Sequence, residues 1–264
     1  MAPRHLATAT HEAEPVLSRL GSARWLQGDD PVANVYMASP DLRIRVGFLP
    51  EAPGPLWQIV AGEPFGTRPA WLVTMSDETP AEIVADFASA LIALHAEDQP
   101  EAYLTDRTPT DLDSVLVSAG WNNVRDDRLA SDFWQSPDGY AEAHEVPGKP
   151  IPDRELAGKA GRWIINGGND KTRWWITASS GTPTRLVAAL QSAVVNPVPV
   201  RRYGSDLHHL PATATITQVA PVRGTSRAAA AHAGSALLRS VHPASTRPPG
   251  HVSAGPRTPV TNTR

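Results

Sequence analysis

Arginine and tryptophan side chains are the groups in this sequence that could bind a ligand by recognisable chemistry. Arg43 and Arg45 alternate with apolar residues, so both point to the same side of an extended strand. Trp174 and Trp175 are adjacent, so only one of them can face a core from a single sheet. Aromatic rings that stack on bases, beside cations that contact phosphates, are typical of proteins that bind single-stranded nucleic acid. We expect such a surface to contain Arg43, Arg45, Trp71, Arg173 and Trp175.

The distribution of charge argues against a phosphate-bearing ligand. Residues 1–200 hold 16 Lys and Arg against 26 Asp and Glu, whereas residues 201–264 hold 8 Arg and one acid, Asp206. Phosphate binding needs local positive charge, so the acidic body would need a segregated basic face. The alternative is a protein-interaction module, which holds a peptide in a groove or along a free edge strand. A positive sheet face with exposed Trp would favour nucleic acid, and an acidic or apolar face would favour a protein partner.

Metal-dependent catalysis is the least favoured interpretation. The pairs Asp29-Asp30 and Asp126-Asp127 offer the oxygen ligands that Mg²⁺ prefers, but adjacent acids in a turn are usually solvated. The chain has no Cys, and five of its nine His lie beyond residue 204. Gly167-Gly168 before Lys171-Thr172 lacks the spacing of a phosphate-binding loop. We therefore expect no catalytic residues, no cofactor and no bound metal; an enzyme stays possible but nothing in the sequence supports one.

An internal repeat organises the chain. Ser39-Pro40-Asp41 recurs 97 positions later as Ser136-Pro137-Asp138, and we interpret each copy of this motif as a turn that leads into a strand. The residues around it recur in the same order, with a change of offset that indicates an insertion near residues 148–160 of the second copy. The matching pairs include Trp25 and Trp121, Pro50 and Pro147, Trp57 and Trp163, Trp71 and Trp174, and Thr79-Pro80 and Thr182-Pro183.

Each copy has the pattern of a helix, an antiparallel meander of four or five strands, and a closing helix. Thr79-Pro80-Ala81-Glu82 has the form of a capping box that begins the closing helix of the first copy. Asn166-Gly167-Gly168-Asn169 is predicted to be a hairpin turn in the second copy. A sheet with one apolar face needs a cover. We therefore expect an α+β fold of two repeated units, each an antiparallel meander with flanking helices, packed as a pseudo-symmetric pair.

The repeat also sets the expected boundaries. We expect the first copy to cover residues 1–100, the second to cover residues 101–203, and a basic tail rich in Pro, Ala and Thr to cover residues 204–264. The tail is predicted to be disordered because it has too few large apolar residues to offset its ordering entropy. No stretch approaches the roughly 20 apolar residues of a membrane span, and no signal peptide is evident. A cytoplasmic protein without a membrane partner is the expectation.

This order of motifs and secondary-structure elements resembles that of the SPDY-motif domain, a family of unknown function found mainly in actinobacteria and often in tandem copies. The resemblance rests on the Ser-Pro-Asp motifs, on Trp57, Trp71, Trp163 and Trp174, and on the Thr-Pro that precedes each closing helix. It covers roughly residues 15–200. Leu42 and Gly139 stand where the family motif has Tyr, and Tyr140 comes one position later. The resemblance implies two tandem domains and implies no activity.

Overall fold

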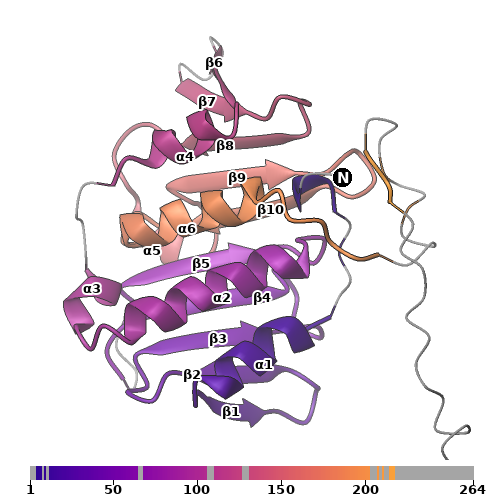
Figure 1. The fold of residues 1–264 in the computed structure, drawn as a ribbon. Coiled ribbons are helices and arrows are strands. Elements are labelled where there is room, and N and C mark those ends of the chain that lie inside the picture. The colour runs from indigo at the N-terminus through magenta and orange to yellow at the C-terminus, as the bar shows by residue number, and fades with distance from the viewer. Residues whose placement is uncertain are drawn as a thin grey trace, which may run out of the picture. The chain divides into compact units, whose positions relative to one another are not determined.

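The strands of both copies join in one antiparallel sheet of ten strands, ordered β1-β2-β3-β4-β5-β10-β9-β8-β7-β6 (Figure 1). This order reads the same from either edge to the centre, where β5 of copy one pairs with β10 of copy two. It confirms the predicted α+β fold and the pseudo-symmetric pair. The strands are β1 (Leu26–Asp29), β2 (Val35–Ala38), β3 (Ile44–Phe48), β4 (Trp57–Ala61), β5 (Trp71–Met75), β6 (Asn122–Asp126), β7 (Ser131–Gln135), β8 (Ala141–Glu145), β9 (Trp163–Gly167) and β10 (Trp174–Ala178).

The computed structural model describes residues 4–7, 9, 12–64, 68–105, 110–126, 131–202, 207, 210 and 214–217, without the side chain of Asp126. Residues Met1–Thr217 belong to one compact unit. The predicted disorder of the tail concerns residues that lie mostly outside the described ones, as does Asp127. Among the described helices, none is both long enough and apolar enough to span a membrane.

Four helices cover one face of the sheet. They lie side by side in the order α1, α2, α6, α4, which follows the order of the strands beneath them (Figure 1). Their bounds are α1 (Glu14–Ser22), α2 (Ala81–His95), α6 (Thr184–Val195) and α4 (Leu112–Ser118). Three shorter helices complete the described set: η1 (Arg4–Leu6), α3 (Pro100–Leu104) and α5 (Pro152–Leu156).

The core lies between these helices and the sheet, and the alternation of apolar residues along strands such as β4 and β10 contributes to it. In β4, Trp57, Ile59 and Ala61 are buried, whereas the intervening residues are half-buried. In copy two, β8 forms with Ala141 and Ala143 at the core-facing positions, although these side chains are small. Pairing with β9 along the whole of β8 compensates for the weak apolar pattern.

Gly167 has a packing role that its place in the predicted turn did not indicate. It is the last residue of β9, so the hairpin loop occupies residues 168–173 and starts later than predicted. A Cβ atom at Gly167 would lie 2.2 Å from Cζ2 of Trp174, which is the residue paired with it on β10. The missing side chain therefore makes room for the buried indole ring.

The pairing of β5 with β10 forms a symmetric seam between the copies. Thr74 and Thr177 face each other at its centre, with their hydroxyl oxygens 2.7 Å apart. On one side, Ser76 Oγ accepts a hydrogen bond from the main-chain N–H of Trp175 at 3.0 Å. On the other side, Ser179 Oγ accepts one from the N–H of Leu72 at 2.9 Å. A pseudo-twofold axis therefore passes between the two threonines.

The predicted capping box at Thr79 is wrong, and the seam explains why. The first turn of α2 has no side-chain cap, because the Thr79 hydroxyl lies 3.1 Å from Ser76 Oγ and 3.4 Å from the carbonyl oxygen of Trp175. Thr182 makes the equivalent contact with Ser179 at 3.4 Å. In each copy, the Ser-x-x-Thr-Pro sequence thus joins the seam to the start of the closing helix.

The predicted insertion of copy two covers part of the sheet face that the four large helices leave open. Helix α5 lies in this insertion, and Glu155 is buried there because its carboxylate accepts hydrogen bonds from the main-chain N–H groups of Ser180 at 2.7 Å and Ile151 at 3.3 Å. Gly158 follows α5 and approaches the side chain of Leu72, which is only 6% exposed. Trp175 holds the symmetry-related position on β10 and stays half-buried.

The seam predicts a matched pair of stability effects. Ser76→Ala removes the acceptor of the Trp175 N–H, and Ser179→Ala removes that of the Leu72 N–H. Ser179→Ala leaves a buried main-chain donor unpaired and Ser76→Ala a partly buried one, so we expect each to lower the free energy of unfolding by about 1–2 kcal/mol in urea denaturation. Ser192→Ala is the control, because this exposed hydroxyl only bonds back to Ala188 O within α6. Equal stability of all three variants would contradict the assignment.

Candidate functional site

Each Ser-Pro-Asp motif forms the turn that the sequence predicted. In copy one, Ser39 Oγ accepts the N–H of Ile44 at 2.9 Å and donates to Asp41 at 2.5 Å. Asp41 also accepts the N–H of Arg43 at 3.2 Å, while Leu42 has a left-handed backbone with φ of 62°. The serine and the aspartate therefore close the hairpin between β2 and β3.

Copy two repeats this turn bond for bond. Ser136 Oγ accepts the N–H of Ala141 at 2.9 Å and donates to Asp138 at 2.6 Å, and Asp138 accepts the N–H of Tyr140 at 3.2 Å. Gly139 has the left-handed backbone here, with φ of 75°. The position after Asp needs this backbone in both copies, which is costly for Leu42 and easy for Gly139.

The aspartate of each turn also binds a ring from a distant segment. In copy one, the Tyr103 hydroxyl of α3 donates to Asp41, and His95 Nε2 at the end of α2 lies 3.1 Å from the same carboxylate. In copy two, His5 Nε2 of η1 lies 2.9 Å from Asp138. The described residues of copy two offer no second histidine there, since Val198 stands where the repeat would place an equivalent of His95.

A buried tryptophan completes the site in each copy. Trp71 Nε1 donates to the main-chain carbonyl oxygen of Tyr103 at 2.7 Å, and Trp174 Nε1 donates to that of His5 at 3.1 Å. One indole N–H and one carboxylate thus hold a single residue by its backbone and by its side chain. We call this arrangement the Trp–Asp clamp: Trp71 with Asp41 in copy one, and Trp174 with Asp138 in copy two.

The two clamped segments correspond to each other in the repeat. His5-Leu6 and Tyr103-Leu104 are 98 positions apart, and both leucines are buried. Each segment precedes the first helix of one copy and fills the clamp of the other copy. Sequence reasoning missed this exchange, because the only signal was one shared Leu beside two unlike rings.

A second tryptophan lines each clamp. Trp25 packs edge-on against His95 with ring centroids 6.0 Å apart, and Trp121 packs edge-on against His5 at 6.2 Å. Both tryptophans are 5% exposed and lie just before the first strand of their copy. In copy two, His5 therefore makes both the contact with the aspartate and the edge-on contact with the tryptophan. In copy one, these contacts are divided between Tyr103 and His95.

The clamp aspartates are held in their ionised form. Burial raises the pKa of Asp138, but hydrogen bonds from His5, Ser136 and the main chain outweigh burial and lower it to about 2. Burial likewise opposes the hydrogen bonds from Ser39, Tyr103, Arg43 N and His95, which lower the pKa of Asp41 to about 2. Burial, followed by the contact with Asp41, raises the pKa of Tyr103, which stays a donor.

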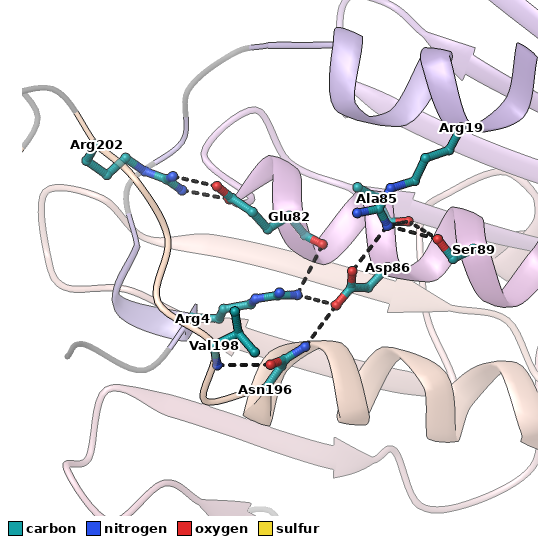
Figure 2. Close-up of polar contacts among 9 residues, drawn as sticks. All are labelled: Arg4, Arg19, Glu82, Ala85, Asp86, Ser89, Asn196, Val198 and Arg202. Atoms are coloured by element: carbon teal, nitrogen blue, oxygen red, sulfur yellow. Dashed lines mark hydrogen bonds and ion pairs between the residues drawn. The ribbon is translucent and has the colours of Figure 1, made fainter. Parts of the chain in front are cut away.

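Segment η1 has a second anchor on α2 (Figure 2). Arg4 pairs with Asp86 and lies 3.4 Å from Glu82 O. Asp86 also accepts from Arg19 of α1 at 3.2 Å and from Asn196, just after α6, at 3.1 Å. Copy two has Ala189 at the position that corresponds to Asp86, so this network serves η1, and the described residues show no equivalent carboxylate for α3.

The structure separates the five predicted ligand-binding residues. Trp71 is a correction: it is 0% exposed and belongs to the clamp, so it cannot stack on a ligand at the surface. Arg43 is paired with Glu63 at 3.3 Å. Arg45 lies on β3 and Trp175 on β10, with β4 and β5 between them, which places their strands about 14 Å apart. The predicted residues that stay at least partly exposed at the surface fall into two separate pairs: Arg43 with Arg45 at β3, and exposed Arg173 with half-buried Trp175 at β10.

The sheet face opposite the four large helices is mixed in character, and we call it the open face. Its described side chains alternate with the buried ones of each strand and carry charges of both signs between apolar groups. They include Arg45, Gln58, Val60, Glu142, His144, Ile164, Asn166, Trp175 and Thr177. The segregated basic face that phosphate binding would require is not found among these residues.

The predicted acidic pair Asp29-Asp30 holds a turn. Asp30 accepts hydrogen bonds from the side chain of Asn34 at 2.8 Å and from the N–H groups of Val32 and Asn34. The bond from the Asn34 side chain is the main reason why the pKa of Asp30 is lowered. Within the described part of the chain, no group of three or more His, Cys, Asp or Glu is placed to hold a metal ion.

The low pKa values of Asp41 and Asp138 predict a pH dependence of stability. A carboxyl whose folded pKa lies below its unfolded value stabilises the protein above the unfolded pKa, here 3.8, and this contribution disappears as the pH falls through about 2. At pH 6, Asp41→Asn and Asp138→Asn should each be less stable than the parent, on the order of 1 kcal/mol after allowing for solvent screening. Urea denaturation from pH 6 to pH 2 should show this gap closing. Asp170→Asn at an exposed loop position is the control, and a pH-independent gap would contradict the prediction.

Comparison with known families agrees with the repeat. The model of the SPDY domain, described as a domain of unknown function (DUF317), matches residues 38–97 and residues 135–200. The two matches contain the Ser-Pro-Asp aspartates and the clamp tryptophans of their own copies. No curated protein and no solved structure matches the sequence. Each copy of the repeat thus contains one match to the SPDY domain, and the two copies share one sheet.

Proposed function

We propose that this protein is a non-enzymatic protein-interaction module whose ligand is a segment of polypeptide chain. The observation that carries the proposal is the pair of Trp–Asp clamps. Each clamp holds a polypeptide segment by a main-chain carbonyl oxygen, a ring that donates a hydrogen bond, and a buried leucine on the next residue.

The chemistry of the clamp explains why a polypeptide suits it. The indole N–H of Trp174 is buried and can only donate, so an occupant that lacks an acceptor would cost about 1–3 kcal/mol. Asp138 is ionised and can only accept, so the occupant must bring an N–H or O–H donor. A peptide unit with a His or Tyr side chain meets both demands within one residue.

The open face supports the same class of partner. It carries acidic as well as basic side chains, among them Glu142 and the Arg43–Glu63 ion pair, and apolar side chains lie between the charged ones. A mixed face of this kind is typical of surfaces that meet other proteins. Single-stranded nucleic acid is a second candidate, favoured by one observation: exposed Arg173 follows the same side of the chain as Trp175.

Selection of displayed random peptides on the full chain tests the proposal. We expect the enriched peptides to share His or Tyr followed by an apolar residue. Their binding should fall at least about tenfold in Asp138→Asn or Asp41→Asn, equivalent to one lost charge-assisted hydrogen bond. Asp170→Asn should bind like the parent. Absence of enrichment, or binding that ignores both clamp aspartates, would overturn the proposal.

An oligonucleotide titration tests the second candidate. A labelled single-stranded oligonucleotide should bind the full chain at about 50 mM salt, where phosphate contacts are strongest, and should dissociate steeply as salt rises. Trp175→Ala should weaken binding and reduce the change in tryptophan fluorescence, whereas the exposed Val117→Ala should leave both unchanged. Failure to bind at low salt would exclude nucleic acid as the ligand.

A further inference from the structure

The clamp of copy two is filled less well than that of copy one. In copy one, two donors reach Asp41, namely the Tyr103 hydroxyl and His95 Nε2. In copy two, His5 is the only described residue of a distant segment that reaches Asp138. The other donors to Asp138, Ser136 and the main chain of Tyr140, belong to its own turn.

Segment η1 also carries buried polar atoms that its site does not satisfy. Among the described residues, Nδ1 of His5 and Nε of Arg4 are buried and have no hydrogen-bond partner. Both atoms lose their hydrogen bonds to water when η1 enters the site, and the site returns none to them. Tyr103 in copy one has no such atom, because its hydroxyl is bonded to Asp41. The occupant of copy two is therefore an imperfect ligand.

The anchor of η1 lies outside the clamp. Arg4 pairs with Asp86 on α2, which belongs to copy one, whereas His5 and Leu6 occupy copy two. The segment is thus held at two separate points, and weakening either one leaves the other intact. This separation makes it possible to loosen the occupant without altering Trp174 or Asp138.

We propose that the Trp174–Asp138 clamp is a peptide-binding site, and that η1 is its exchangeable internal ligand. The site takes, from another polypeptide, a residue whose ring donates a hydrogen bond, followed by leucine. This inference rests on the proposed function and names its site and its control. Tethering keeps η1 at an effective concentration in the millimolar range. A partner peptide must therefore either bind more favourably than η1 or bind after the Arg4–Asp86 anchor has been weakened.

Peptide binding to variants of the full chain tests the inference. The probe is the fluorescein-labelled peptide Ala-Pro-Arg-His-Leu-Ala, which has the sequence of residues 2–7. Two variants loosen η1: Arg4→Ala/His5→Gly within the segment, and Asp86→Asn outside it. We expect both to bind the probe at least about tenfold more tightly than the parent chain, measured by fluorescence anisotropy, because the internal competitor is weakened.

Matched controls separate clamp binding from general loosening. A probe with Phe in place of His keeps the ring but has no donor for Asp138, so it should bind at least about tenfold more weakly. Asp138→Asn added to Asp86→Asn should abolish the gain. Near-ultraviolet circular dichroism verifies that Asp86→Asn is folded, and this variant decides the test if Arg4→Ala/His5→Gly is not.

Each outcome bears on a distinct claim. Equal affinity of the parent and the Asp86→Asn chain, equal affinity of the His and Phe probes, or binding that survives Asp138→Asn would each overturn the inference. If peptides selected by display bind the parent through Asp41 while loosening η1 changes nothing, the proposed function stands and this inference fails. If no peptide binds the parent or the loosened chains, both fail.

Discussion

The hydrogen-bonded pairing of β5 with β10 is the interaction on which the rest of the molecule depends. It turns two five-strand meanders into one sheet and fixes their register through the paired hydroxyls of Thr74 and Thr177. A strand edge left unpaired would be open to other chains, and here each copy covers the edge of the other. The helices α2 and α6 pack together above this seam, so the core continues across it.

The exchange of clamped segments is a second tie between the copies. The seam joins them through strands, whereas the clamps join them through side chains and single carbonyl oxygens. The clamp of copy one holds α3, which follows the closing helix α2 of the same copy closely in sequence. The clamp of copy two holds η1, which precedes α1. In the part of the chain that the structure describes, the Arg4–Asp86 network is formed on one side only, which reflects this difference in connection.

Much of the fold could be predicted from the repeat, because apolar alternation and turn residues are local properties. The two meanders, the closing helices and the Ser-Pro-Asp turns follow from patterns within a few residues, and the insertion of copy two follows from the change of offset between the copies. The site could not be predicted in the same way. Trp71 has the residue type of a stacking platform, and only its neighbours across the sheet and in α3 reveal that its N–H is committed to Tyr103.

Long-range pairing also explains the errors in detail. Thr79 has the sequence of a helix cap, but Ser76 and the carbonyl oxygen of Trp175 lie close to it and engage its hydroxyl. Gly167 lies in a sequence that is typical of a turn, but in the structure it is in β9 and is paired with Trp174 of β10. The Ser-Pro-Asp motif predicts a turn that leads into a strand, but nothing in the sequence indicates that its carboxylate meets a ring 62 residues away in copy one or 133 residues away in copy two.

The reciprocal placement of η1 and α3 has a topological consequence. Each copy binds the segment that precedes the first helix of the other copy, so the two copies exchange segments in addition to sharing a sheet. A single cut in the connection between α3 and α4 would leave α3 in the clamp of copy one and η1, carried by the same fragment, in the clamp of copy two. The two fragments would still share the strand seam and one exchanged segment. The strand seam and the clamps therefore connect the two copies by non-covalent contacts that do not involve the backbone between α3 and α4, as the contacts of a dimer interface would.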